Sequence, residues 1–471
     1  MTAHDFYAAT NPTRTGTIIG LMSDRKLTRV GFVSLGCPKN LVDSEVMLGT
    51  LQQHGYSITH SKNEADVLVV NTCGFIDSAK QESIDTILEM AELKNTGNCR
   101  KLVVAGCLAE RYRDDIRKQI PEIDFVFGPD ELGKILEAVR NDEDSIPDIS
   151  IDSLYTSREV PTIPRILSTP SYMAYLKISE GCDHVCSFCA IPGFRGKFRS
   201  RRIEDLIAES RRLAEQDVRE LVLVSQDTMA YGKDLGMDDG ITELLRQLAA
   251  VDGLRWVRFL YCYPHTVTDA LIRLVSEEAK LCKYFDIPYQ HASSAVLDRM
   301  LRGGNRGAYE RQIEKIRKLN PEAGLRTSFI VGFPGETEND FHEILTFMKN
   351  VEFDNVGVFL YSDEEGTGAF SLDGKVQRRT ASRRRNELMK EQLKISKRKL
   401  RQMVGRKFDV LLEGSSDESE LLLQGRTQGQ APDIDGHVLI NDTNDVEART
   451  GEFYPVEITG SMEYDMIGRI I

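Results

Sequence analysis

The sequence predicts an α/β protein of three domains: an N-terminal parallel α/β domain, a central partial (β/α)6 barrel and a small C-terminal all-β barrel. Apolar, strand-like runs alternate with helix-like stretches through most of the chain, which is the order of parallel α/β domains. The last part shows alternating polar and apolar residues, as in antiparallel sheets. With 471 residues, 41% of them hydrophobic, the chain is long enough to build several cores.

The N-terminal domain is placed at residues 29–145, after a polar extension at residues 1–28 that lacks periodicity. Its strand-like runs begin at Arg29 (RVGFVSLGC), Asp66 (DVLVVNTCG) and Lys101 (KLVVAGC). Helix-like stretches cover Asp43–His54 and Ser78–Leu93. This order of strand, helix and strand predicts a parallel sheet.

The central domain is placed at residues 171–374, after a proline-rich linker at residues 146–170. Six apolar segments rich in β-formers are separated mostly by helical stretches, and they are Met173–Ser179, Glu220–Gln226, Trp256–Cys262, Tyr284–Tyr289, Leu325–Phe333 and Asn355–Tyr361. Six β/α units in series predict parallel strands arranged as in a barrel. Because a full barrel of this type has eight strands, we expect a partial one.

Two segments of opposite charge follow. Residues 375–404 carry twelve lysines and arginines against two glutamates, a net charge of +10, and are interpreted as a basic helical connector. This helix is either solvated on its way out of the core or in contact with RNA, such as ribosomal RNA, or another anion. Residues 405–471 carry five basic and fourteen acidic residues, a net charge of −9. Their alternating runs Phe408–Leu412, His437–Ile440 and Glu452–Ile458 predict the small all-β domain.

Overall charge and cysteine content limit the functions that this chain can have. A net charge of −13 disfavours a general nucleic-acid binder, because phosphate neutralisation needs Lys and Arg. Apolar runs are far shorter than the ~20 residues that span a bilayer, and the N-terminus lacks the pattern of a signal peptide. We therefore expect a cytoplasmic protein with no membrane partner. Nine cysteines in that reducing compartment are expected to be metal ligands, nucleophiles or small buried residues.

The sharpest motif is the spacing C-x3-C-x2-C at Cys182, Cys186 and Cys189, directly after the first strand of the predicted barrel. Three thiolates on one loop can hold three irons of a [4Fe–4S] cluster. The fourth iron then keeps an open position for a small molecule, as catalytic metals do. The alternative is a structural zinc site with His184 as fourth ligand, but His184 lies inside the loop in poor geometry.

A second set of cysteines is dispersed. Cys37, Cys73 and Cys107 lie 36 and 34 residues apart, and each follows an apolar strand, in LGCPKN, NTCGF and AGCLAE. Because parallel strands end at one edge of a sheet, these cysteines are expected to converge on one point and to hold a second iron–sulfur cluster. The alternative is three small buried cysteines. The remaining Cys99, Cys262 and Cys282 show no such pattern and are interpreted as incidental.

Polar residues follow four of the barrel strands and predict a rim at the strand ends. The rim residues are Ser225, Gln226, Asp227, Tyr261, Tyr263, Pro264, His265, Pro288, Gln290, His291, Gly332, Pro334, Gly335 and Glu336. Any single one is equally well explained as a satisfied loop residue.

Together these features resemble the methylthiotransferases, a radical S-adenosylmethionine (SAM) subfamily with two clusters. The resemblance covers roughly residues 28–468, and the segments that carry it are Ser34–Glu45, Val70–Phe75, Gly181–Arg199, Asp286–His291 and Arg326–Glu336. It implies a barrel of radical SAM type and a C-terminal domain of TRAM type. It also implies that the two sets of three cysteines hold two [4Fe–4S] clusters.

The resemblance further assigns SAM contacts. The open iron at Cys182, Cys186 and Cys189 would chelate SAM, and one electron would cleave it to a 5′-deoxyadenosyl radical. Phe188 would lie beside the adenine, Gln226 and Asp227 near the SAM amino group, and Gly332 near the adenine. A reductant such as flavodoxin or ferredoxin is the implied electron donor.

The implied reaction is insertion of a methylthio group at an unactivated C–H bond, with a second SAM supplying the methyl group. One branch of the family modifies an adenosine in tRNA, and the other modifies an aspartate β-carbon of small-subunit ribosomal protein twelve. The acidic C-terminal domain suits a basic protein better than RNA, and Cys37–Asn40 (CPKN) and Ala190–Gly196 (AIPGFRG) resemble the ribosomal-protein branch. We therefore expect the ribosomal protein, in the small subunit, as partner. A non-catalytic iron–sulfur scaffold is the alternative from a different functional class.

Overall fold

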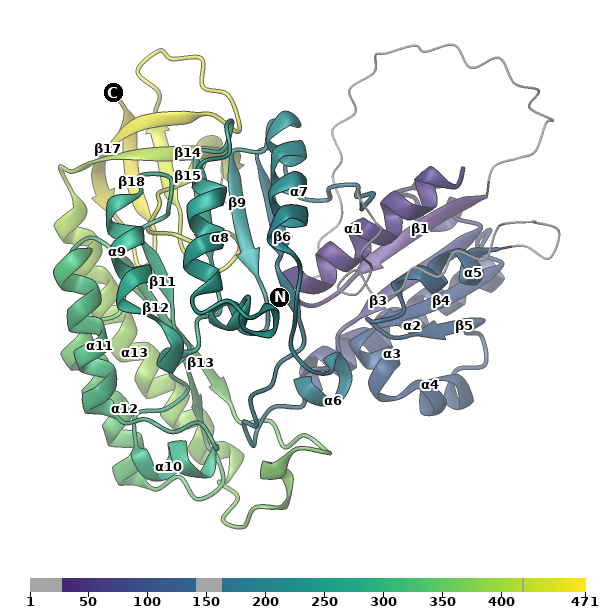
Figure 1. Cartoon of the computed structure of the whole chain (residues 1–471), viewed down its shortest axis with the longest axis horizontal. Coiled ribbons are helices and arrows are strands. Elements are labelled where there is room, and N and C mark those ends of the chain that lie inside the picture. The colour runs from purple at the N-terminus through teal and green to yellow at the C-terminus, as the bar shows by residue number, and fades with distance from the viewer. Residues whose placement is uncertain (1–27, 141–162, 417–418) are drawn as a thin grey trace. The chain divides into compact units, whose positions relative to one another are not determined.

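The computed structural model describes residues 28–140, 163–416 and 419–471 (Figure 1). These residues form two compact units. The first comprises the described residues up to Pro170, together with Glu180–Cys182 and Ala190–Asp205; the second comprises Ser171–Ser179, Asp183–Cys189 and Leu206–Ile471. Residues 1–27 of the extension predicted at residues 1–28, and residues 146–162 of the linker predicted at residues 146–170, lie outside the described ranges. None of the described helices is both long and apolar enough to cross a membrane.

The first unit contains a five-stranded parallel sheet in the order β2-β1-β3-β4-β5. Its strands are β1 (Arg29–Ser34), β2 (Ser57–Thr59), β3 (Val67–Thr72), β4 (Lys101–Gly106) and β5 (Phe125–Phe127). Its helices are α1 (Pro38–Gln53), α2 (Asp77–Thr96), α3 (Cys107–Arg111), α4 (Arg113–Gln119) and α5 (Ile135–Val139). The three predicted strands are confirmed, and the short strands β2 and β5 extend the sheet at its two edges.

Helices cover both faces of this sheet. Leu68 and Val70 of β3 pack in one apolar cluster with Ile87 and Met90 of α2. Val67 and Val69 of the same strand pack in the opposite cluster, with residues of α1 and α5. This explains the uninterrupted apolar run of β3, because a strand buried on both faces has no polar side.

The second unit contains the six predicted barrel strands, all parallel to their neighbours. They are β6 (Met173–Lys177), β9 (Glu220–Val224), β10 (Trp256–Phe259), β11 (Tyr284–Asp286), β12 (Gly324–Val331) and β13 (Asn355–Leu360). They form two three-stranded sheets, β10-β9-β6 and β11-β12-β13, which are linked by a bridge between Val257 and Leu281 and by a hydrogen bond from Cys262 N–H to Asp286 O. The predicted partial barrel of six strands is therefore confirmed.

Helices flank these strands (Figure 1), and they are α7 (Ile203–Glu215), α8 (Gly240–Ala249), α9 (Asp269–Glu277), α10 (Ser294–Arg299), α11 (Arg306–Leu319) and α12 (Glu338–Val351). Short elements in the segment after β6 are β7 (Ser179–Glu180), α6 (Ile191–Arg195) and β8 (Arg199–Ser200). The predicted basic connector is the helix α13 (Arg378–Met403), which packs along β13 and α12.

The C-terminal segment closes into a five-stranded barrel in the order β14-β15-β16-β18-β17. Its strands are β14 (Lys407–Ser416), β15 (Ser419–Arg426), β16 (Val438–Asp442), β17 (Phe453–Ser461) and β18 (Met466–Ile470). Alternation along the chain predicted three of them. β15 and β18 were not among the three; in β15, a run of three leucines interrupts the alternating pattern.

A buried ion network joins this small barrel to strands β9 and β10 of the partial barrel. Glu220, at the start of β9, lies 2.8 Å from Arg258 of β10 and 2.6 Å from Arg426 of β15, and all three side chains are fully buried. Arg426 also contacts Glu413 at 2.7 Å. Because a buried charge is costly unless paired, this network fixes the C-terminal barrel at the amino ends of the strands, opposite to the ends that carry the polar rim.

Candidate active site

The three dispersed cysteines sit at the carboxyl ends of neighbouring strands. Cys37 precedes the first residue of α1, Cys73 directly follows β3, and Cys107 directly follows β4. β3 pairs in parallel with both β1 and β4. The fold therefore brings the three cysteine loops to one edge of the sheet, as the strand pattern predicted.

Glycines allow these loops to touch. Gly36 has φ +91°, and a Cβ there would lie 2.7 Å from the Cβ of Cys73. A Cβ on Gly74 would lie 2.9 Å from the backbone of Leu108 and 3.0 Å from that of Cys107. No side chain fits in either gap, so the absence of a Cβ at both positions permits the close approach of the cysteines.

The thiols are near enough to influence one another. Burial, together with the charges of Cys37 and Cys107, raises the pKa of Cys73 to about 12. Burial also raises the pKa of Cys107 to about 11, although the Arg195 guanidinium opposes this shift. Three convergent thiols fit a [4Fe–4S] cluster with one open iron. Such a metal must displace the thiol protons when it binds.

A single metal ion is a poorer fit. In the described ranges, no three His, Cys, Asp or Glu side chains are arranged to hold one metal ion. The proposed zinc ligand His184 has another partner, since its Nε2 lies 2.7 Å from Oδ2 of Asp227. Its ring also stacks on Tyr263, with 3.7 Å between the ring centroids. The zinc alternative therefore receives no support from His184.

The second set of cysteines lies on the segment that follows β6 and β7. Cys182 belongs to the first unit, where its backbone N–H donates to the carbonyl of Gly196 at 3.1 Å. Cys186 and Cys189 belong to the second unit and form a turn in which Cys189 N–H donates to Cys186 O at 3.0 Å. All three cysteines are half-buried, which leaves them accessible to a ligand.

Backbone contacts with neighbouring loops hold the turn. Ser187 donates its N–H to Met300 O at 2.9 Å and its hydroxyl to Arg299 O at 2.8 Å. In return, its carbonyl accepts from Ala369 N–H at 2.7 Å. Phe188 packs against an apolar cluster that includes Phe333. The loop is thereby anchored to the segments that follow α10 and β13.

A buried arginine contacts the same turn. Arg302 Nη1 lies 3.6 Å from the sulfur of Cys186, and Nη2 lies 2.6 Å from Pro288 O. The guanidinium also lies over the ring of Tyr263, 4.5 Å from its centroid. His184, Tyr263 and Arg302 thus form one stack, with Asp227 at one end and Cys186 at the other. Sequence reasoning missed Arg302, because nothing in its local sequence marks it.

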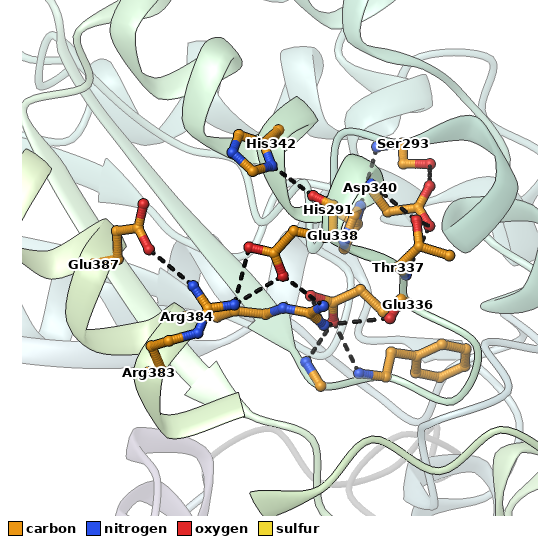
Figure 2. Close-up of polar contacts among 12 residues, drawn as sticks. His291, Ser293, Glu336, Thr337, Glu338, Asp340, His342, Arg383, Arg384 and Glu387 are labelled. Atoms are coloured by element: carbon orange, nitrogen blue, oxygen red, sulfur yellow. Dashed lines mark hydrogen bonds and ion pairs between the residues drawn. The ribbon is translucent and has the colours of Figure 1, made fainter. Parts of the chain in front are cut away.

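The residues expected to contact SAM lie in different parts of the second unit. Gln226 is half-buried just after β9, and Asp227 is buried and bonded to His184. Phe188 lies in the apolar cluster described above. His291 of the rim is fully buried and accepts from Ser293 N–H at 3.0 Å, and burial lowers its pKa to about 3, so the ring is neutral (Figure 2). Contact of Phe188, Gln226 and Asp227 with SAM stays a prediction.

Gly332 sits in a loop held by Glu336. It has φ +81°, and a Cβ there would lie 2.5 Å from the Cβ of Ala381 in α13, so its small size serves close packing of that helix. Glu336 accepts from the backbone N–H groups of Gly332 and Phe333 and lies 3.0 Å from Arg384 Nη1 (Figure 2). Burial raises the pKa of Glu336 to about 7, against the lowering effect of Arg384.

Comparisons with known proteins follow the same division of the chain. A model of the Radical SAM superfamily matches residues 176–348, and a TRAM domain model matches residues 404–471. A model described as Uncharacterized protein family UPF0004 matches residues 29–128, which include Cys37, Cys73 and Cys107.

Many relatives match nearly the whole chain, and two of them show the pattern. Ribosomal protein uS12 methylthiotransferase RimO of Solibacter usitatus is 50% identical, over 94% of this chain and 95% of the relative. The protein of the same name in Koribacter versatilis is 48% identical, over 95% of this chain and 97% of the relative. This chain belongs to the RimO family of methylthiotransferases.

RimO membership makes the chain a transferase and confirms the resemblance stated from the motifs. As a radical SAM family, it uses [4Fe–4S] chemistry and SAM as cofactors. A solved structure agrees on the fold: the radical SAM methyltransferase TsrM of Kitasatospora setae aligns with a TM-score of 0.51 at 13% identity, over 71% of this chain and 75% of that one. The cytoplasmic location stays a prediction.

Proposed function

We propose that this chain inserts a methylthio group at the β-carbon of an aspartate in ribosomal protein uS12, with two [4Fe–4S] clusters and two SAM molecules. The observation that carries the proposal is the convergence of Cys37, Cys73 and Cys107 at the strand ends of the first unit. Cleavage of SAM needs only the C-x3-C-x2-C cysteines. A second set of three convergent thiols gives the chain a separate place to hold sulfur for transfer. A non-catalytic iron–sulfur scaffold would not require this second set of cysteines.

The chemistry divides between the two sets of cysteines. When bound, the cluster at Cys182, Cys186 and Cys189 supplies the electron for SAM cleavage, and the cluster at the dispersed cysteines supplies the sulfur. The stack of His184, Tyr263 and Arg302 holds the turn that carries Cys186. Anchored in this way, the turn presents its thiols in one fixed geometry, which is what orientation of a reactive substrate requires.

The charges of the C-terminal barrel support a protein substrate. Exposed acidic residues gather from the last residue of β16 to the start of β17, and they are Asp442, Asp445, Glu447 and Glu452. Ribosomal proteins are basic, so this surface suits the uS12 named in the RimO relatives and disfavours a nucleic-acid phosphate backbone.

The basic connector gives little support to the tRNA alternative. Much of the positive charge of α13 is paired with acidic side chains, as in Arg384–Glu336, Lys397–Glu463, Arg398–Glu352 and Lys399–Asp354. Paired cations attract phosphates less strongly. The arrangement favours a helix anchored to its surroundings over one dedicated to RNA, and a contact with ribosomal RNA stays a prediction.

The test offers both substrates to the reconstituted enzyme. The chain is incubated anaerobically with SAM, reductant and sulfide, in parallel with small ribosomal subunits, free uS12 and unmodified tRNA. Mass spectrometry of the products is expected to show a methylthio mass gain on one aspartate of uS12 and none on tRNA. A gain on tRNA adenosine would overturn the proposed substrate. SAM cleavage without any methylthio product on these acceptors would overturn the proposed transfer.

A further inference from the structure

Arg195, the last residue of α6, is buried among polar side chains of the first unit. Only 2% of its side chain is exposed. Its guanidinium contacts four side chains: Cys107 Sγ at 3.2 Å, Asn40 Oδ1 at 2.6 Å, Asp43 Oδ2 at 3.0 Å and Glu180 Oε2 at 2.8 Å. Arg195 therefore meets one of the dispersed cysteines directly.

Two buried carboxylates are enough to compensate the positive charge of Arg195. A buried guanidinium is costly unless it is paired and hydrogen-bonded. Asp43 and Glu180, 2% and 0% exposed, both pair with Nη1 and supply two negative charges. The Nε–H donor directed at Cys107 is thus not needed to neutralise Arg195. It is an additional contact aimed at the sulfur.

Asn40 extends this contact to the other two cysteine loops. While its Oδ1 accepts from Arg195, its Nδ2 donates to Leu35 O and to Thr72 O, both at 2.9 Å. Leu35 lies two residues before Cys37, and Thr72 directly precedes Cys73. One guanidinium and one amide therefore connect the loops of all three cysteines.

We infer that Arg195 is a positioning residue for the cluster at Cys37, Cys73 and Cys107: its Nε–H donates to the Cys107 sulfur and makes that cluster easier to reduce. The inference rests on the proposed function, because it requires a cluster at these cysteines. Hydrogen bonds and positive charge at a ligand sulfur stabilise the more negative, reduced cluster. Loss of the Nε–H donor and of the positive charge at Cys107 should therefore make this cluster harder to reduce.

The experiment isolates this cluster and measures its potential. In a parent variant, Cys182, Cys186 and Cys189 are all replaced by Ala, and the full chain is reconstituted anaerobically with iron and sulfide. A potentiometric titration followed by electron paramagnetic resonance gives the midpoint potential. Arg195→Gln is expected to shift it to a more negative value. Arg195→Lys keeps the charge but lacks the planar fork, so an intermediate shift is expected.

Arg199 provides the matched control. It lies four residues further along the same segment, its side chain is 30% exposed, and it pairs with Asp130 at 2.7 Å. Arg199→Gln removes the same charge without touching a cysteine, and it is expected to leave the potential and spectrum of the parent unchanged.

The experiment distinguishes a failure of the proposed function from a failure of the inference about Arg195. If the parent holds no iron–sulfur cluster, the second cluster of the proposed function is wrong. If the parent holds a cluster and both Arg195 variants keep its potential, the inference about Arg195 is wrong. Arg195→Lys leaves a cation opposite Asp43 and Glu180, so it gives a result even if Arg195→Gln does not fold.

Discussion

Cys37, Cys73 and Cys107 come from three loops that lie 36 and 34 residues apart, whereas Cys182, Cys186 and Cys189 lie within eight residues of one segment. The parallel sheet brings the first set together, with Gly36 and Gly74 letting the loops touch. The second set is already close in sequence. For Cys186 and Cys189, the fold adds side chains that hold the turn, above all the stack of His184, Tyr263 and Arg302.

This difference predicts which substitutions should disturb each set of cysteines. Backbone geometry builds the dispersed set, so a single added methyl group should disturb it. The turn of Cys186 and Cys189 is held by the contacts of Ser187 and by the stack of His184, Tyr263 and Arg302, so it should respond to loss of a side-chain partner. Each set also has its own buried arginine, Arg195 at Cys107 and Arg302 at Cys186.

The largest expected effect comes from removing one cysteine of each set. Cys186→Ala should abolish SAM cleavage, because it removes a ligand of the cluster that supplies the electron. Cys73→Ala should spare SAM cleavage and abolish methylthio transfer to uS12. Chromatography of 5′-deoxyadenosine and mass spectrometry of uS12 measure the two steps. If Cys73→Ala leaves the product yield intact, the assignment of the dispersed cysteines is wrong.

A smaller effect is expected from Gly36→Ala. The substitution places a Cβ at φ +91° against Cys73, which should cost roughly 1–3 kcal/mol of folding free energy. It should also reduce iron bound at the dispersed cysteines. Urea denaturation and iron analysis check both effects. Gly193→Ala is the control, because a Cβ there meets nothing within 4 Å. Equal losses in the two variants would contradict the role of backbone contact.

Asp227→Ala tests the support of the contiguous set. The change removes the partner of His184, a contact of 2.7 Å, and a bond of this kind is worth about 1.5 kcal/mol when one partner is charged. SAM cleavage should therefore slow by about tenfold, measured as kcat/KM for SAM. Asp227→Asn keeps an acceptor and should lose less. Similar losses of kcat/KM in both variants would show that the hydrogen bond to His184 does not support SAM cleavage.

The sequence was sufficient for some of these features. The six barrel strands, the C-x3-C-x2-C motif and the convergence of the dispersed cysteines were all predictable, because strand order alone determines which loops share an edge. The contacts of Arg195 and Arg302 with the cysteines were not predictable. The partners of Arg195 lie 15 to 155 residues away from it in the chain, and a local pattern cannot show a contact over such separations.

The smallest expected effect concerns the acidic surface. Replacing both Asp442 and Asp445 by Lys reverses part of the exposed charge of the C-terminal barrel, and association with uS12 should slow by about three- to tenfold at low salt. The difference from the unmodified chain should shrink as salt rises. Stopped-flow association at several ionic strengths measures this. SAM cleavage without substrate should not change, and faster association of the double variant would contradict the charge argument.

The most direct test of two separate cysteine sets is their iron content. Iron and acid-labile sulfide are measured per chain in the reconstituted protein and in two triple variants, one with Cys37, Cys73 and Cys107 replaced by Ala and one with Cys182, Cys186 and Cys189 replaced. The account predicts about eight irons in the unmodified chain and about four in each variant. About four irons in the unmodified chain, or no loss in the variant that lacks the dispersed cysteines, would contradict it.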